Sequence, residues 1–389
     1  MINYGLSSDT WDHNEVNALH RVIESNRYTM GSEVKSFEKN FAEFMGAKHA
    51  VMTNSGSSAN LITLATLALH PKFQHKANRG KLNVIVPTVS WSTTYFPVHQ
   101  WGFQLKFADV DVNTFNISVD DVLNKIDDNT VAVFAVNLLG SAADLERLKA
   151  VCDASGIILL EDNCESLGAT LYDGRQCGTI GTMGTFSFFF SHHLQTMEGG
   201  MVLTDDDELV DYLRSLRAHG WVRDMEFGTF ETTGDPFKDS FKFVLPGYCV
   251  RPLEMSGAVG KEQLHKWPSM LETRRKNALV AKEAFNSDRV RLQVEHGYSS
   301  WFGFGMILRG PLEGRRDEVI AKLTEQGVES RPIVAGNFQK NPVIERMDCI
   351  TCDAPAADYI DTNGFFIGND CIDLEDKIIQ VGELINSIE

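Results

Sequence analysis

Three things that the sequence lacks narrow the classes of protein to which it can belong. None of its apolar runs approaches the roughly 18 residues that a membrane-spanning helix needs, and its first residues lack the basic start and apolar stretch of a signal peptide. Its seven cysteines are odd in number and do not follow the spacing of a disulfide framework. We therefore expect a protein of the reducing cytoplasm with no membrane segment.

Positive charge is also scarce. Thirty-six Lys and Arg residues face 53 Asp and Glu residues, which gives a formal net charge of -17 and a pI near 5.1. A field of that sign repels phosphate groups, so it argues against general binding to nucleic acids or membrane surfaces. A small anionic ligand would need locally placed donors, which basic residues between Arg214 and Arg251 could supply.

What is present is the pattern of a folded α/β protein. The 389 residues fit two domains of ordinary size, and the 43% hydrophobic and 23% charged residues are typical of globular proteins. The first half alternates β-rich runs with helical patterns. Strands are predicted at residues 49–54, 83–87, 105–110, 131–137, 156–162, 184–190 and 199–204. Helices are predicted at residues 12–26, 32–45, 57–70 and 142–155, with another that begins at Ser118.

The pattern changes after Pro246. Helices are predicted at residues 251–266, 269–285, 316–326 and 374–388, with a strand at residues 300–308. This pattern favours a large domain over residues 1–250 and a smaller α+β domain over residues 251–389. The polar segment 229–239, which contains Gly and Pro, is the best candidate for a mobile loop.

Asp162 is the first candidate for chemistry, because it ends the apolar run GIILLED and parallel sheets present functional groups at such strand ends. Taken alone, it would be interpreted as a helix cap or a salt-bridge partner. Glu161 and Glu165 make the surroundings acidic, but no histidine is close in sequence. We therefore expect no metal site here.

Three further segments carry candidate residues. In GTFSFFFSHHLQTMEGG an aromatic strand delivers His192 and His193 into a loop, although such pairs are usually structural. The turn around Gly56, between a strand and a helix, has small residues whose N–H groups and hydroxyls could surround a phosphate; a plain helix cap is the alternative. Trp91 follows the strand NVIVP, and alone it would be interpreted as a core tryptophan.

Together and in this order, these segments resemble the DegT/DnrJ/EryC1/StrS family of sugar aminotransferases over nearly the whole chain. The resemblance rests on the motifs VPTVSWSTTY, DVDVNTFNIS, LLEDNCESLGA, TFSFFFSHH…EGG and GYCVRPLEMSGAVG. It implies the pyridoxal-phosphate-dependent transferase fold of type I. That fold has a mixed, mostly parallel seven-stranded sheet and a smaller C-terminal α+β domain.

The resemblance also implies a cofactor, pyridoxal 5'-phosphate or pyridoxamine 5'-phosphate, and residues that hold it. Trp91 would lie against one face of the ring, and Asp162 would pair with the pyridine nitrogen. That charge-assisted bond is worth about 1.5–3 kcal/mol. The phosphate is expected at Gly56, Ser57, Ser58 and Ser187. Glu165 is also expected at the cofactor, where many family members have Gln or His.

The family's Schiff-base lysine falls at His192. Nothing nearby can substitute for it, since no lysine occurs between Lys149 and Lys238. An imidazole cannot form the covalent link, but it can move protons near neutral pH. His192 is therefore the predicted catalytic base.

Within the family, the chain resembles members that act as sugar 3-dehydratases. This implies removal of the 3-hydroxyl of a nucleotide-linked 4-keto-6-deoxy sugar, with GDP-4-keto-6-deoxy-D-mannose as the expected substrate, L-glutamate as amino donor and ammonia as a product, in colitose-type deoxysugar biosynthesis. A homodimer with shared active sites is expected. Two alternatives stay open: a sugar-nucleotide aminotransferase that uses a lysine from elsewhere, such as Lys242, and a non-catalytic sugar-nucleotide-binding protein.

Some positions leave their roles undecided. Arg251 and Arg331 are candidates for substrate carboxylates, although ordinary salt bridges would explain them equally well. Cys249 stands where relatives carry an asparagine that reaches the neighbouring subunit's cofactor phosphate, and a thiol is a weak donor. Cys349 and Cys352 form one Cys-x-x-Cys, which is incidental without a second pair of ligands.

Overall fold

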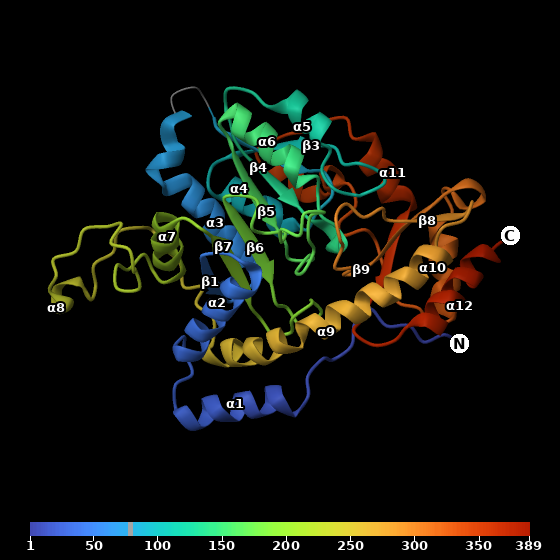
Figure 1. The fold of residues 1–389 in the computed structure, drawn as a ribbon. Coiled ribbons are helices and arrows are strands. Elements are labelled where there is room, and N and C mark those ends of the chain that lie inside the picture. Colours follow the sequence, from blue (N-terminus) through green and yellow to red (C-terminus); the bar gives the residue numbers. More distant parts are fainter. Residues whose placement is uncertain (77–80) are drawn as a thin grey trace.

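A mixed sheet of eight strands forms the centre of the first half of the chain (Figure 1). The structure, a computed structural model, describes residues 1–76 and 81–389. The strands are β1 (His49–Thr53), β2 (Asn83–Pro87), β3 (Gln104–Ala108), β4 (Thr130–Val136), β5 (Ile158–Asp162), β6 (Met183–Ser187), β7 (Gly200–Thr204) and β11 (Cys349–Ile350). Their order across the sheet is β1-β7-β6-β5-β4-β2-β3-β11.

Only β7 runs against its neighbours, so the sheet is mostly parallel, as predicted. Every residue of β2 and β4 is buried, which explains why both read as continuous apolar runs. The seven predicted strands correspond to β1–β7. The eighth, β11, pairs with β3 at the edge of the sheet; its two residues are too few to give a periodic signal.

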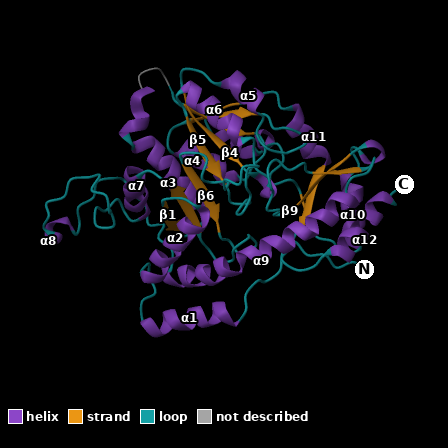
Figure 2. Ribbon diagram, viewed as in Figure 1, coloured by secondary structure: helices purple, strands orange, loops and turns teal. Residues whose placement is uncertain are grey.

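Helices connect the strands and cover the sheet (Figures 1 and 2). Side chains fix several of their starts: Ser55 accepts a hydrogen bond from the Ser58 N–H, and Ser118 accepts one from the Asp121 N–H. The helices are α3 (Gly56–Leu69), α4 (Ser92–Gln100), α5 (Val119–Lys125), α6 (Leu145–Ser155) and α7 (Asp207–Arg217), with 3-10 turns η1 (Pro71–Lys76) and η2 (Leu138–Gly140).

A second, antiparallel sheet lies in the C-terminal part of the chain, in the order β10-β12-β9-β8. The strands of this sheet are β8 (Val290–Leu292), β9 (Gly303–Leu308), β10 (Ser330–Arg331) and β12 (Gly364–Gly368). The helices of this part of the chain are α10 (Arg316–Glu325), α11 (Pro355–Asn363) and α12 (Glu375–Asn386). Its 3-10 turns are η3 (Gly310–Leu312), η4 (Phe338–Lys340) and η5 (Pro342–Arg346). The strand predicted from residue 300 begins at Gly303, since Trp301 has a left-handed backbone (φ 50°) that no strand accommodates. The division at residue 250 remains a prediction.

One helix, α9 (Glu254–Ala284), replaces the two that were predicted for residues 251–266 and 269–285. The predicted break at residues 267–268, which include Pro268, is wrong. An interior proline costs about 3 kcal/mol, but the helix buries Trp267 and Met270 on either side of it. The N-terminal helices α1 (His13–Ser25) and α2 (Ser32–Met45) pack along α9, as does α12 (Figure 1).

Between α7 and α9, residues 221–250 form an arm that extends away from the rest of the molecule and carries the four-residue helix α8 (Pro236–Asp239) (Figure 1). The base of the arm is held by Asp211, a buried side chain of α7. Its carboxylate accepts hydrogen bonds from the backbone N–H groups of Glu226 (2.7 Å), Phe227 (3.2 Å) and Thr229 (3.1 Å). The mobility predicted for residues 229–239 remains a prediction.

None of the helices formed by residues 1–76 and 81–389 combines the length and the apolar character needed to span a bilayer.

Candidate active site

A cavity of about 410 Å³ opens where strands β4, β5 and β6 end. In an open parallel sheet, this edge is where ligands bind. Segments after five strands of the large sheet reach the cavity, and two residues come from the C-terminal part of the chain. The lining residues are Ser55, Gly56, Ser57, Ser90, Trp91, Thr93, Val136, Leu138, Asp162, Cys164, Glu165, Ser187, Phe189, Ser191, His192, Glu198, Phe302 and Val334.

Asp162 lies at the inner wall of this cavity and is almost fully buried. Its Oδ2 atom accepts hydrogen bonds from Asn60 Nδ2 (2.9 Å) and Thr94 Oγ1 (2.8 Å), and its Oδ1 atom accepts one from the Cys164 N–H (3.1 Å). In the described part of the chain it neither pairs with a cation nor caps a helix. The simple structural interpretations of Asp162 therefore do not apply, and the carboxylate is held rigidly toward the cavity.

Glu161, the preceding residue, lies on the opposite face of β5 because side chains alternate along a strand. Its carboxylate is fully buried and accepts hydrogen bonds from the N–H groups of Gly178 (2.7 Å), Ile180 (2.8 Å) and Gly181 (2.6 Å). Burial raises the pKa of Glu161, and these bonds oppose the shift. The acidic side chains near the end of β5 therefore do not form one cluster: Glu161 lies on one face of the sheet, and Asp162 and Glu165 lie at the cavity. The described residues contain no group of three or more His, Cys, Asp or Glu side chains that could hold a metal ion.

The start of α3 forms one wall of the cavity. Ser57 Oγ donates to Thr93 Oγ1 (3.0 Å) at the rim, and Ser187 lines the cavity from the end of β6. Gly56 packs so closely that an added Cβ would lie 2.5 Å from the Ser187 Cβ and 2.9 Å from the Cys164 Sγ. Ser58 instead bonds back to Ser55, the cap of the helix, and is not among the lining residues. The turn is thus both a helix cap and a small-residue wall at a positive helix end.

Trp91 stands at the mouth of the cavity with 60% of its surface exposed. It precedes α4 in the N-cap position and provides no side-chain cap. A tryptophan of the hydrophobic core would be buried, so that interpretation is wrong. An exposed indole beside a cavity can instead cover a planar ligand.

His192 and His193 lie in different environments. The ring of His192 lines the cavity, 5.3 Å from the Phe302 ring and 6.0 Å from the Phe189 ring. Burial lowers the pKa of His192 to about 4, although the backbone at Ser187 and Cys164 and the charge of Asp162 oppose the shift. His193 is 1% exposed and packs against Trp267. Of the two histidines, only His192 is therefore placed, in neutral form, to accept a proton in the cavity.

Glu165 lines the cavity beside Asp162. Its Oε2 atom accepts a hydrogen bond from the Leu139 N–H (3.0 Å), where Leu139 has a left-handed backbone (φ 53°). Burial, together with the charge of Asp162, raises the pKa of Glu165 to about 7, while the bond from Leu139 opposes the shift. At neutral pH the site therefore holds a carboxyl that carries a proton for part of the time.

Other residues singled out in the sequence lie outside the cavity. Arg251 donates from Nη2 to the Cys249 Sγ (3.6 Å) at the base of the arm, and Arg331 is exposed on β10. Lys242 donates to the Glu231 carbonyl within the arm. None of these is among the lining residues, and no lysine of the described chain is.

The Cys349-x-x-Cys352 motif behaves as a structural pair of thiols. Burial and the neighbouring Asp348 raise the pKa of Cys349, and burial raises the pKa of Cys352 to about 11. Both thiols are free and protonated at neutral pH.

Several residues of the site were not singled out from the sequence. Asn60 bridges the site, since it donates to Asp162 and accepts from Thr185 Oγ1 (2.6 Å). Asn60 and Thr94 do lie inside the motifs SGSSAN and SWSTTY, so polar residues within these motifs were the available signal. Phe302 and Val334 lie in the segments SSWFGF and RPIV, which also carry the resemblance, but neither residue was singled out.

Comparison with known proteins agrees with this geometry. The GDP-4-keto-6-deoxy-D-mannose 3-dehydratase of Yersinia pseudotuberculosis is 52% identical over 384 residues, which cover 97% of each chain. A solved structure of GDP-4-keto-6-deoxymannose 3-dehydratase with a trapped PLP-glutamate geminal diamine matches with a TM-score of 0.94 at 44% identity, over 98% of this chain and 100% of that one.

A further solved structure is a variant of that enzyme in which a histidine is replaced by lysine and the serine before it by asparagine. It matches with a TM-score of 0.92 at 44% identity, over 97% of this chain and 100% of that one. The sequence model of the DegT/DnrJ/EryC1/StrS aminotransferase family matches residues 9–366. A cavity that presents Asp162, Ser187 and His192 on a mixed sheet, together with a match over most of the chain, means that this protein belongs to the DegT/DnrJ/EryC1/StrS aminotransferase family.

Proposed function

We propose that this protein is a pyridoxamine-phosphate-dependent 3-dehydratase of a nucleotide-linked 4-keto-6-deoxy sugar, with GDP-4-keto-6-deoxy-D-mannose as the substrate and L-glutamate as the amino donor. The observation that carries the proposal is the pairing of His192 with Asp162 in a cavity that no lysine of the described chain lines. A family site without a lysine cannot tether its cofactor, whereas it retains a group that moves protons.

The residues present fit a pyridoxal or pyridoxamine phosphate. Gly56, Ser57 and Ser187 would hold the phosphate at the positive end of α3, and the close approach of Gly56 to Ser187 leaves no space there for a larger side chain. Trp91 would cover one face of the ring, and Asp162 would keep its nitrogen protonated. When bound, the cofactor would supply an amine that can condense with the 4-ketone of the sugar and a protonated ring that can accept electrons.

His192 would take a proton at its imidazole from the C4′ carbon of the cofactor and return it to the departing 3-hydroxyl, which would leave as water. Its buried Nδ1 atom has no hydrogen-bond partner in the described chain, and its pKa of about 4 keeps the ring unprotonated before the reaction. One solved relative supports this position, because the residues varied in it are an adjacent serine and histidine. This chain contains one Ser-His pair, Ser191-His192.

The proposal includes a homodimer, with the arm as part of its interface. Four phenylalanines on the arm are exposed to at least 40% of their surface: Phe227, Phe237, Phe241 and Phe243. Apolar side chains gathered on an extended segment are typical of a surface that a second chain covers. Seven free thiols also support a cytoplasmic location.

The test supplies the glutamate-treated protein with GDP-, dTDP-, UDP- and CDP-linked 4-keto-6-deoxy sugars and measures ammonia and 2-oxoglutarate. We expect both products with the GDP-linked sugar, and loss of ammonia release in His192→Asn with cofactor binding retained. His20→Asn, at an exposed histidine of α1, is the matched control.

Two outcomes would replace the proposal. An amino sugar formed without ammonia would make the protein an aminotransferase, and borohydride would then trap cofactor on a lysine such as Lys242. Tight binding of the sugar nucleotide without any product would make it a non-catalytic binding protein.

A further inference from the structure

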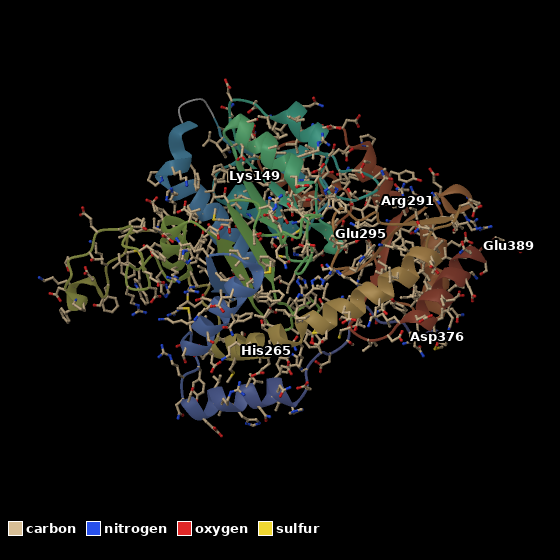
Figure 3. All side chains as sticks on the ribbon, viewed as in Figure 1. Lys149, His265, Arg291, Glu295, Asp376 and Glu389 are labelled. Carbon is tan, nitrogen blue, oxygen red and sulfur yellow. The ribbon has the colours of Figure 1, made fainter. Side chains whose placement is uncertain are left out.

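A second pocket, of about 460 Å³, opens between the small sheet and α11. Arg291 of β8 and Arg309, just beyond β9, lie at it, and its walls include Val112, Ile307 and Tyr359. Figure 3 labels Arg291 on the side of the molecule formed by the C-terminal elements. No lining residue is shared with the cavity around Asp162, so this is a separate site.

The two guanidinium groups have only neutral partners. Arg291 donates to Asn113 Oδ1 (2.5 Å) and to the Val112 carbonyl (3.0 Å), and Arg309 Nε donates to the Ser287 carbonyl (2.7 Å). Within residues 1–76 and 81–389, no ion pair joins either arginine to a carboxylate. Among the described residues, no hydrogen bond is formed by Arg291 Nε or Arg309 Nη1, which leaves donors for a ligand.

The two positive charges also act on each other. Burial lowers the pKa of Arg291, and the charge of Arg309 lowers it further. Tyr359 and then Asp111 oppose the shift of this pKa, and the Asp111 carboxylate already accepts hydrogen bonds from the Asn113 and Thr114 N–H groups. In a chain of net charge -17, two neighbouring arginines that form no ion pair with a described carboxylate are unusual, and an anion between them would reduce their repulsion.

The walls of the pocket are mostly apolar. Val112, Ile307 and Ala356 contribute aliphatic surface, and Tyr359 contributes a ring from the same helix as Ala356. The volume lies within the range of about 300–1,000 Å³ that small-molecule sites have. Arginines beside apolar walls favour a ligand that has both a negative charge and an apolar part. The planar guanidinium group can donate two parallel hydrogen bonds to a phosphate or carboxylate.

We propose that this pocket binds a small organic anion, whose phosphate or carboxylate group lies against Arg291 and Arg309 and whose aromatic or aliphatic body lies against Ile307, Ala356 and Tyr359.

The test is titration calorimetry on the protein loaded with pyridoxal phosphate and then freed of excess cofactor, because free pyridoxal phosphate is itself an aromatic anion that could occupy this pocket. The probes are phenyl phosphate and benzoate, which share a ring and differ in the anion, with phenol and inorganic phosphate as the separate halves. We expect phenyl phosphate or benzoate to bind with a Kd of about 1 mM or tighter. Phenol and inorganic phosphate should each bind at least about tenfold more weakly, and the stronger of the two anions identifies the ligand class.

Two variants locate the binding. Arg291→Gln removes one cation, and Ala356→Phe fills the apolar part while both arginines remain; each should weaken binding at least about tenfold. Arg315→Gln is the matched control, since Arg315 pairs with Glu318 outside the pocket. If Arg291→Gln fails to fold, Ala356→Phe decides alone. Absence of binding to the unmodified protein, or binding that Ala356→Phe leaves unchanged, would overturn the proposal.

Discussion

Two neighbouring carboxylates, Glu161 and Asp162, show how the two faces of one strand serve different purposes. Glu161 is enclosed and has three backbone N–H donors from residues 178–181. Asp162 is held by two side chains and one N–H group, and it faces a cavity. The same chemical group thus fixes a loop on one face of β5 and prepares a binding site on the other.

The difference lies in what supplies the hydrogen bonds. Backbone donors around Glu161 depend on the path of the chain, so the carboxylate and the loop hold each other in place. Side-chain donors around Asp162 come from α3 and α4, which carry other residues of the cavity. A substitution at Glu161 should therefore act on stability, and one at Asp162 on function.

The largest effect is expected for Asp162→Asn. The neutral amide cannot keep the cofactor nitrogen protonated, so product formation should fall roughly 10- to 100-fold, as expected from a lost charge-assisted bond. The melting temperature should change little. Steady-state ammonia release and thermal unfolding measure the two quantities, with Asp153→Asn, at an exposed position of α6, as the control. Unchanged ammonia release would contradict the role of Asp162.

Glu161→Gln should instead lower stability and leave turnover unchanged. A glutamine offers one acceptor and an amide donor to three backbone N–H groups, which leaves at least one buried donor unsatisfied at a cost of about 1–3 kcal/mol. We expect a lower melting temperature with normal turnover per folded molecule. Calorimetry and active-site titration would check this. A loss of turnover without a loss of stability would contradict the assignment of Glu161 to stability and Asp162 to function.

Glu165 provides a pH-dependent test of the cavity face. Its pKa of about 7 lies above the ordinary value of 4.5, so between these values the folded protein binds a proton that the unfolded chain releases. Its contribution to stability therefore falls as the pH rises from about 4.5 to about 7. Glu165→Gln removes this dependence, so the melting temperature of the cofactor-free variant should rise relative to the unmodified protein across that interval. Parallel profiles would contradict the raised pKa.

The smallest effect is expected for Trp91→Ala. The exposed indole contributes little to the core, so stability should be unchanged. Loss of a stacking contact of about 0.5–1.5 kcal/mol should weaken cofactor binding roughly 2- to 12-fold. Equilibrium dialysis against pyridoxal phosphate measures this affinity, and Tyr172→Ala, at another exposed aromatic residue, is the control. Equal affinities in both variants would remove Trp91 from the cofactor site.

Much of the fold could be predicted from the sequence, because buried parallel strands read as apolar runs and several helix starts carry capping residues. The path of α9 through Pro268 could not, since the packing of Trp267 and Met270 outweighs a local helix-breaking signal. Nor could β11, which depends on a pairing with β3 across more than 200 residues.

The candidate site was predicted in part. Asp162, Ser187 and His192 stand at strand ends or in a distinctive motif, and they line one cavity. Asn60 and Thr94 are separated from Asp162 by 102 and 68 residues in the sequence. No periodic pattern of apolar residues indicates such long-range contacts. The exposure of Trp91 and the bond of Ser58 back to the helix cap Ser55 depend on side-chain directions, which motif matching does not give.

The packing of α2 against α9 has a consequence for how the chain is made. Helix α2 ends at Met45, and α9 ends at Ala284. A ribosome adding roughly 5–20 residues per second needs about 12–48 s to cover that separation. Throughout this time the apolar face of α2, with Val34, Phe37 and Phe41, has no α9 to cover it. Newly made chains should thus depend on chaperones, and fragments that stop before Glu254 should aggregate.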